Sequence, residues 1–217
     1  MKQEEREKGK EESSGIFIVF EGPEGAGKTT QIARLAARLQ EQEIDLILTR
    51  EPGGTPAADA VRSVILDPAL TIDPLPEFLL YSASRAQHVA EVIAPALKLG
   101  KTIISDRFFG ASVAYQGYGR GLELDFIHEL TERVTQGIKP DLVLLLDLDP
   151  AVGLERVAKR GQRDRLERTD LAFHQRVREG FLEQAKANDT WVVFDATQSE
   201  AALADALWET VRGRLKL

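Results

Sequence analysis

Residues 22–29 read GPEGAGKT, a complete G-x-x-x-x-G-K-[ST] phosphate-binding loop, or P-loop. An apolar run rich in strand formers precedes the loop at residues 16–21, and apolar side chains recur at helical spacing through residues 30–42 after it. A strand, a glycine-rich turn and a helix N-terminus form the context in which this motif binds phosphate. Glycines let the backbone close around an anion, while successive N–H groups and the helix dipole point at its oxygens. The motif therefore predicts that this chain binds a nucleoside triphosphate.

Two side chains of the loop have specific expected tasks. Lys28 is expected to reach the β- and γ-phosphates, and the Thr29 hydroxyl is expected to hold Mg²⁺. A chance glycine-rich turn is the alternative, and the flanking strand and helix argue against it. The ATP-binding residues predicted from the loop are Gly22, Pro23, Glu24, Gly25, Ala26, Gly27, Lys28, Thr29 and Thr30.

Strand-like and helical patterns alternate along the rest of the chain. Continuous apolar runs suit strands that are buried on both faces of a parallel sheet. Repeated βα units predict an α/β P-loop NTPase fold, with a five-stranded parallel sheet and helices on both faces. The runs predict strands at residues 16–21, 45–49, 102–106, 141–147 and 190–195. Helical spacing predicts helices at about 30–42, 57–65, 75–99, 124–136, 150–159, 171–188 and 200–215.

Composition limits the partners and the compartment. The net charge of -7 and the pI near 5.2 argue against a bulk affinity for nucleic acid or for anionic membranes. The absence of cysteine excludes disulfides, thiolate zinc sites and cysteine nucleophiles. No apolar run approaches the roughly 20 residues of a membrane-spanning helix, and the mixed-charge residues 1–14 contain no secretory signal. We therefore expect a disordered tail at 1–14, a single kinase-like P-loop domain at 15–217 and a cytoplasmic location.

Charged residues follow the expected strands at the sheet edge where this class of fold places its chemistry. Arg50 follows the second strand, and Asp106 and Arg107 end the third. Each has an ordinary alternative, because an arginine leaving a strand is usually solvated and the Glu-Pro-Gly-Gly after Arg50 is usually a tight turn. Arg50, Arg107 and Arg85 together indicate a second cationic site, facing the P-loop, for an acceptor that carries a phosphate. Asp106 is expected to bear on Mg²⁺ or its waters.

A cationic segment follows the fourth expected strand. A solvated basic helix face is one interpretation of such a run. In an acidic chain with a P-loop, the other is a short mobile lid at about 150–170, which closes over the phosphates, excludes water and supplies a catalytic arginine. The cationic residues are Arg156, Lys159, Arg160, Arg163, Arg165 and Arg168.

From about residue 15 to residue 217 the chain resembles the thymidylate (dTMP) kinase family. The resemblance rests on four ordered motifs: FEGPEGAGKTT at 20–30, TREPGGT at 49–55, YSASR at 81–85, and DRF at 106–108 followed by AYQG at 114–117. The P-loop alone is common to many NTPases, whereas the second and fourth motifs together are close to diagnostic. The resemblance implies ATP-dependent phosphorylation of dTMP to dTDP in dTTP synthesis, with Mg²⁺, by a homodimer.

The family pattern also implies roles for matching positions at the acceptor. Arg50, Arg85 and Arg107 would hold the dTMP phosphate. Tyr81 stands where the family has an aromatic that stacks on thymine, although a core aromatic is the alternative at such a helical position. Ser112 falls where a polar contact to the base is common.

The implied roles extend to the sugar and to the P-loop. Tyr115 would crowd the sugar 2′ position and favour deoxyribose, with Gln116 nearby as a further substrate contact. Glu24 would touch the 3′-OH and help organise the arginines; otherwise it would be an ordinary exposed loop residue.

One departure from part of the family concerns Gly25. Some members carry a basic residue there, directed at the γ-phosphate, which glycine cannot replace. Members without it carry the catalytic arginine in the lid, and we predict Arg160 for that role, with Arg165 and Arg156 as further candidates. The predicted catalytic residues are Lys28, Arg107, Arg160, Asp106 and Glu24.

Alternatives to this interpretation remain open. The chain could phosphorylate another nucleotide or a nucleoside, although Tyr115 and the acceptor arginines favour a deoxynucleoside monophosphate. It could also be a switch or motor NTPase, but it lacks the Asn-Lys-x-Asp segment by which switch GTPases specify guanine. The apolar helices at 75–99 and 124–136 could form the interface of a homodimer, or they could be ordinary core helices.

Overall fold

A single five-stranded sheet organises the computed structural model, which describes residues 15–159, 161 and 164–215. The expectations for residues 1–14, Arg160 and Arg163 fall outside these described residues. All strands are parallel and lie in the order β2-β3-β1-β4-β5, so the predicted fold class is confirmed. The strands are β1 (Phe17–Glu21), β2 (Leu46–Arg50), β3 (Thr102–Asp106), β4 (Leu142–Asp147) and β5 (Trp191–Asp195).

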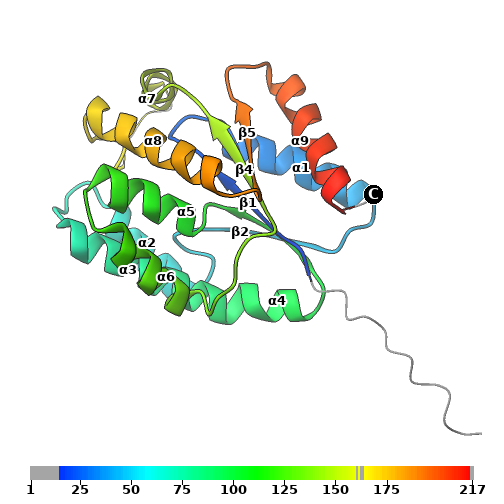
Figure 1. Ribbon diagram of the computed structural model, residues 1–217, viewed down its shortest axis with the longest axis horizontal. Coiled ribbons are helices and arrows are strands. Elements are labelled where there is room, and N and C mark those ends of the chain that lie inside the picture. The colour runs from blue at the N-terminus through cyan, green and yellow to red at the C-terminus, as the bar shows by residue number, and fades with distance from the viewer. Residues whose placement is uncertain (1–14, 160, 162–163, 216–217) are drawn as a thin grey trace, which may run out of the picture.

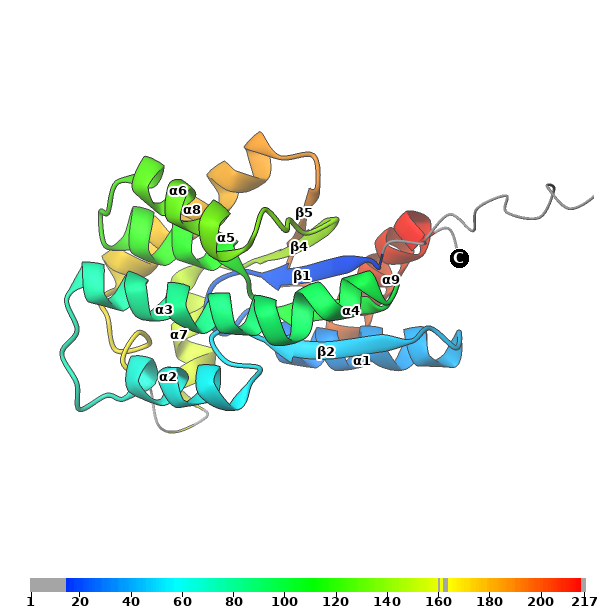
Figure 2. The same ribbon diagram turned by 90° about the horizontal axis from the view of Figure 1, so that it is seen from below.

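Helices cover both faces of the sheet (Figure 1). Successive side chains of a strand point to opposite faces, so Ile18 and Phe20 pack against α1 and α9, whereas Phe17 and Val19 face η1 and α4. The short helix α2 lies beside α3, as Figure 2 shows from a second direction. The helices are α1 (Lys28–Glu41), α2 (Pro56–Leu66), α3 (Pro74–His88), η1 (Val89–Ile93), α4 (Ala94–Lys98), α5 (Phe109–Ser112), η2 (Val113–Gly119), α6 (Leu124–Val134), α7 (Pro150–Ala158), α8 (Leu171–Ala187) and α9 (Glu200–Leu215).

Two helical regions differ from the expectation. The helix predicted at 75–99 is divided into α3, the π-helical turn η1 and α4. Pro95, the second residue of the last piece, has no N–H to donate to the preceding turn, which favours a local widening of the helix there. The pair α5 and η2 was not predicted, because its three glycines lower helix propensity. Tertiary packing supports it: a Cβ on Gly119 would lie 2.6 Å from the ring of Phe173 in α8.

Strand register brings the predicted residues to one edge. Asp106 pairs with Phe20 of β1 on one side and with Arg50 of β2 on the other. The P-loop leaves the central strand β1 at the same edge, where the chain order of the strands reverses direction. Within the described part of the chain, no helix is both long enough and apolar enough to cross a membrane.

Candidate active site

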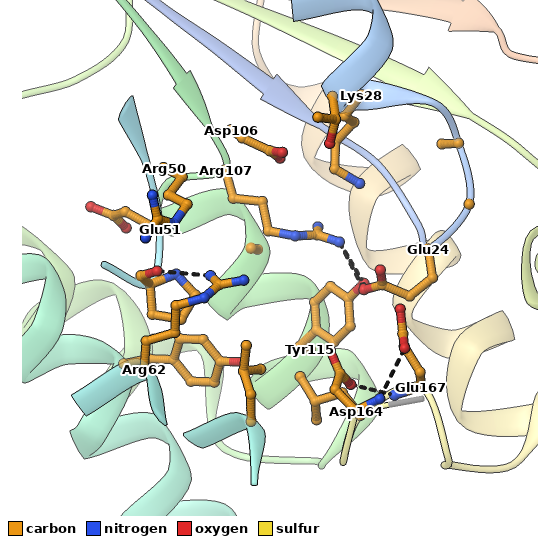
Figure 3. A pocket seen from close by; sticks show the side chains of 18 of the residues that line it. Glu24, Lys28, Arg50, Glu51, Arg62, Asp106, Arg107, Tyr115, Asp164 and Glu167 are labelled. Carbon is orange, nitrogen blue, oxygen red and sulfur yellow. Dashed lines mark hydrogen bonds and ion pairs between the residues drawn. The ribbon is translucent and has the colours of Figure 1, made fainter. Parts of the chain in front are cut away.

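A cavity of about 530 Å³ opens at the carboxyl edge of the sheet (Figure 3). The P-loop forms one side of it, and α3 with η2 forms the other. Its size and its mixture of charged and aromatic groups suit small-molecule ligands. The lining residues are 24–30 of the P-loop, Arg50, Glu51, Pro52, Arg62, Leu66, Tyr81, Asp106, Arg107, Ala111, Ser112, Tyr115, Gln116, Arg156, Asp164, Leu166 and Glu167.

Lys28 is folded back onto its own loop. Its Nζ donates hydrogen bonds of 3.1 Å to the carbonyl oxygens of Gly22 and Pro23, and the residue is only 8% exposed. Burial lowers the pKa of Lys28, and the neighbouring charge of Arg107 lowers it further. The ammonium group therefore already lies inside the loop that is expected to wrap the phosphates.

The position of Gly25 explains the departure noted in the sequence. Its φ is +72°, and a Cβ built on it would lie 2.4 Å from the carbonyl oxygen of Gly153 in α7. A Cβ on Gly153 would lie 2.2 Å from the carbonyl oxygen of Glu24. The P-loop and α7 thus meet backbone to backbone, and no side chain fits at either position.

This contact gives a first prediction. We expect Gly153→Ala to raise the KM for ATP about tenfold, because the new methyl group must displace the P-loop backbone. Steady-state kinetics with varied ATP checks the effect. Gly213→Ala in α9 is the matched control, since a Cβ there meets no atom within 4 Å. An unchanged KM for ATP in the Gly153 variant would contradict the prediction.

Arg107 joins the two sides of the cavity. Its Nη1 donates to the Gly22 carbonyl oxygen at 2.9 Å, and its Nη2 donates to Glu24 Oε1 at 2.8 Å and to the Tyr115 hydroxyl at 3.1 Å. The Tyr115 hydroxyl in turn donates to Glu24 Oε1 at 2.6 Å. Figure 3 shows the Arg107 side chain extending toward Glu24 across the cavity. The sequence prediction that Glu24 organises an arginine is consistent with this geometry.

The carboxyl groups of Glu24 and Glu21, both near Arg107, have very different pKa values. Burial raises the pKa of Glu24, but the charges of Arg107 and Lys28 outweigh it and hold that pKa at about 2. Burial raises the pKa of Glu21 to about 7, against the opposing charge of Arg107. Glu21 Oε1 accepts from the backbone N–H groups of Phe108 and Ala111, both at 3.0 Å. Glu21 therefore holds the turn that carries Arg107, whose φ is +73°.

Arg50 and Arg62 form the cationic rim on the β2 side. Arg50 donates to Asp59 Oδ1 at 2.8 Å, and Arg62 donates to the Pro52 carbonyl oxygen at 2.8 Å. Burial lowers the pKa of Arg62, and the adjacent Arg50 adds to that effect. Arg62 was not predicted from the sequence. Its i+3 spacing from Asp59 on α2, next to the Arg50 loop, is the signal that could have indicated it.

Arg85 is more deeply buried than the other two predicted phosphate ligands. Its side chain is 2% exposed and does not line the cavity. Nε donates to Glu51 Oε2 at 2.7 Å, and Nη2 donates to the Phe108 carbonyl oxygen at 3.2 Å and to Ser112 Oγ at 3.0 Å. Its Nη1 is buried without a hydrogen-bond partner. The structure thus places Arg85 against Glu51, Phe108 and Ser112, buried behind the cavity lining.

The acceptor wall contains the predicted aromatic and polar contacts. Tyr81, Ser112, Tyr115 and Gln116 all line the cavity, from α3, α5 and η2. Burial raises the pKa of the Tyr81 hydroxyl, and the charge of Glu77, one turn earlier on α3, raises it further. Tyr81 lines the cavity and also packs against the core cluster that contains Tyr115 and Phe173.

The described part of the predicted lid carries two of the candidate arginines. Arg156 donates to the carbonyl oxygens of Gly25 at 3.2 Å and of Ala196 at 3.4 Å. Arg165 donates to the Ile65 carbonyl oxygen at 2.8 Å and to Glu77 Oε2 at 2.5 Å, away from the P-loop. Arg160, the first candidate, lies outside the described residues.

The oxygen donors for a metal are few. Thr29 is exposed at the start of α1, and Asp106 ends β3 at the same edge. Among the described residues, no three His, Cys, Asp or Glu side chains are grouped as a metal site. One hydroxyl and one carboxylate suit Mg²⁺, which keeps several waters and takes its other oxygens from phosphates. The two predicted metal ligands therefore fit this ion.

Comparison with known proteins agrees with the geometry. A family model described as "Thymidylate kinase" matches residues 20–207. The chain is 57% identical to a thymidylate kinase of Deinococcus radiodurans over 203 residues, covering 93% of this chain and 98% of that protein. It is 48% identical to one of Thermosynechococcus vestitus, covering 93% and 89%. A crystal structure of thymidylate kinase from Ehrlichia chaffeensis matches with a TM-score of 0.74 and 32% identity, covering 91% of this chain and 99% of that one.

Proposed function

We propose the residue roles below from one premise: this chain belongs to the thymidylate kinase family. It is an enzyme that transfers the γ-phosphoryl group of ATP to dTMP and releases dTDP and ADP. The observation that carries the residue assignment is the position of Arg107. Its guanidinium group contacts the P-loop at Glu24 and the acceptor wall at Tyr115, so it lies where donor and acceptor charges meet.

On the donor side, residues 22–30 bind ATP, and Lys28 neutralises the β- and γ-phosphate oxygens. Thr29 and Asp106 hold magnesium, either directly or through its waters. When bound, magnesium supplies further neutralisation of the phosphate charge. Arg156 stabilises the P-loop by donating a hydrogen bond to the Gly25 carbonyl oxygen.

On the acceptor side, Arg50 and Arg107 bind the dTMP phosphate, and Arg62 joins them from α2. Guanidinium groups suit this task because they bind phosphate oxygens in pairs and remain charged. Arg85 acts at the base through Ser112, because it donates to the Oγ of that cavity-lining residue.

The remaining acceptor contacts concern the nucleoside. Tyr81 stacks on the thymine ring, while Ser112 and Gln116 meet its polar edge. Tyr115 occupies the space of a ribose 2′-OH, and Glu24 accepts from the sugar 3′-OH. These contacts favour a deoxynucleoside over a ribonucleoside.

The chemistry is an in-line displacement. An oxygen of the dTMP phosphate bonds to the γ-phosphorus of ATP, the bond from that phosphorus to the β–γ bridging oxygen breaks, and ADP leaves. No general base is needed, because the acceptor phosphate is already ionised near neutral pH with a second pKa of about 6. Lys28 and Arg107 neutralise the charge as the two phosphates approach.

Residues 150–170 form the lid in this proposal, since Asp164, Leu166 and Glu167 already line the cavity. We expect Arg160→Ala to lower kcat about 10²-fold while changing either KM much less, because its charge is needed in the transition state. Lys159→Ala is the matched control, since Lys159 is exposed and pairs with Glu155. An unchanged kcat would remove Arg160 from this role.

Tyr81 gives a test of the base contact. We expect Tyr81→Ala to raise the KM for dTMP about tenfold and to leave the KM for ATP unchanged, because only the stacking surface is lost. Tyr81→Phe keeps the ring and should stay within about twofold of the wild type. Equal losses for both substrates would indicate misfolding instead.

The reaction itself is tested with purified protein, ATP, Mg²⁺ and one monophosphate at a time: dTMP, dUMP, dCMP, AMP or GMP. We expect rapid ADP release with dTMP, slower release with dUMP and almost none with the others. Preference for another monophosphate would overturn the assigned base contacts. Release without any acceptor would indicate an NTPase.

We also propose a cytoplasmic homodimer. The α3 and α6 helices expose the large apolar side chains Leu75, Leu79, Leu124 and Phe126, which a second copy would cover. Sedimentation of the purified protein tests this, and a single species near 24 kDa would contradict it.

A further inference from the structure

We propose that Glu77, which does not line the cavity, is a positioning residue that selects the acceptor base by orienting the amide of Gln116. The proposal rests on the acceptor site described above. Glu77 lies on α3 one turn before Tyr81 and two turns before Arg85, on the same helix face. It is fully buried, at 0% exposure.

Three donors from different parts of the chain meet the Glu77 carboxylate. Gln116 Nε2 donates to Oε1 at 2.9 Å. Arg120 donates through Nε at 3.3 Å and Nη2 at 3.1 Å, and Arg165 donates through Nη1 at 2.5 Å. A buried carboxylate between two guanidinium groups is an ion-paired acceptor with no proton to offer.

This chemistry fixes the direction of the Gln116 amide. An ionised carboxylate only accepts hydrogen bonds, so Gln116 must turn its NH₂ group toward Glu77. The other end of the amide, the carbonyl Oε1, is then the end left for the cavity, which Gln116 lines beside Ser112. An oxygen at that position accepts a hydrogen bond and cannot donate one.

The fixed amide discriminates among pyrimidines. Neutral thymine and uracil carry a hydrogen on N3, whereas N3 of cytosine is an acceptor. A carbonyl oxygen facing that edge pairs with the first two and opposes the lone pair of the third. Sites built around one hydrogen-bond pattern reject a ligand that leaves their buried polar groups unpaired. Glu77 therefore disfavours dCMP binding through Gln116, without contacting the nucleotide itself.

The Glu77 carboxylate also holds the lid segment in place, because it pairs with Arg165. This arginine belongs to the segment that carries Asp164 and Leu166 into the cavity wall. Its bond to Glu77 holds that segment against α3, and its backbone N–H reaches the Leu66 carbonyl oxygen at 3.4 Å. Arg165 thus anchors the lid segment instead of facing the phosphates.

The test compares the KM for dTMP with the inhibition constant of dCMP as a competitor of dTMP. In Glu77→Gln the new amide can donate to Gln116, so the Gln116 amide can reverse and present NH₂ to the base. We expect the KM for dTMP to rise about tenfold, the KM for ATP to stay within about twofold, and the ratio of the dCMP inhibition constant to the dTMP KM to fall about tenfold or more. Arg120→Gln is the matched control: it removes a donor to the same carboxylate, but Arg165 still pairs with Glu77 and Gln116 still donates to it, so the ratio should stay within about twofold.

A Glu77→Gln protein that melts at lower temperature but keeps the wild-type ratio would overturn the proposal and leave Glu77 a structural residue. If that variant does not fold, Glu77→Gln combined with Arg165→Gln removes the unpaired buried charge and carries the same expected fall in the ratio. An unchanged ratio in the double variant would equally overturn it. Failure of the proposed function is distinct, because the wild-type protein would then show no preference for dTMP.

Discussion

Arg107→Met is expected to lower kcat/KM for dTMP by about 10⁴-fold, within the range that a charge-bridging arginine contributes to phosphoryl transfer. Methionine keeps an unbranched stem but removes the donors to Gly22, Glu24 and Tyr115. Glu24, whose pKa is held at about 2 partly by Arg107, would then lose its cationic partner beside the incoming phosphate. Steady-state kinetics with saturating ATP measures the loss.

The ion pair between Arg107 and Glu24 allows a double-variant test of this prediction. Glu24→Gln combined with Arg107→Met removes the uncompensated carboxylate, so the double variant should be less impaired than the sum of the two single effects. Arg178→Met is the matched control, because Arg178 forms a similar two-bond ion pair with Asp147 outside the cavity. A loss below about tenfold for Arg107→Met would remove Arg107 from the bridging role.

Lys28→Met should lower kcat by about 10³-fold, because the phosphate charge that develops on the donor loses its principal side-chain cation. Lys28 Nζ already lies within 3.1 Å of two P-loop carbonyl oxygens, so the loop is shaped around the ammonium group. Single-turnover kinetics separates this effect from product release.

Binding measurements distinguish a lost charge from a collapsed loop in this variant. Affinity for dTMP should stay within about threefold, because Lys28 makes none of the proposed dTMP contacts and most of these lie on α3, α5 and η2. A parallel loss of dTMP affinity and kcat would indicate that the whole site had changed shape. A kcat near the wild-type value would contradict the prediction.

Local patterns in the sequence were sufficient for the sheet and the P-loop. Each predicted strand lies within one residue of the observed strand at either end, because continuous apolar runs suit a sheet covered on both faces. The same patterns could not predict η2. Its glycines disfavour a helix locally, and the contact with Phe173, more than fifty residues away, makes a glycine necessary at position 119.

The candidate site was predictable where a residue belongs to a sequence motif or comes at a strand end. Arg50, Asp106 and Arg107 come together because parallel strands in register end at one edge. Arg85 has the same charge and was grouped with them, but its helix directs it beneath the acceptor wall toward Glu51 and Ser112. Arg62 and Glu77 carry no motif, and only the packing of α2 and α3 shows their positions.

The sequence by itself determined the fold class, the P-loop and the family, because these depend on short-range periodicity and on motifs whose members are close along the chain. The tertiary structure decided which charges meet. Arg107 meets Glu24 across 83 positions and Arg165 meets Glu77 across 88, and no local pattern specifies such pairs. Charges act over a few ångströms in space, whatever their separation in sequence, so the pairing of these residues is set by packing.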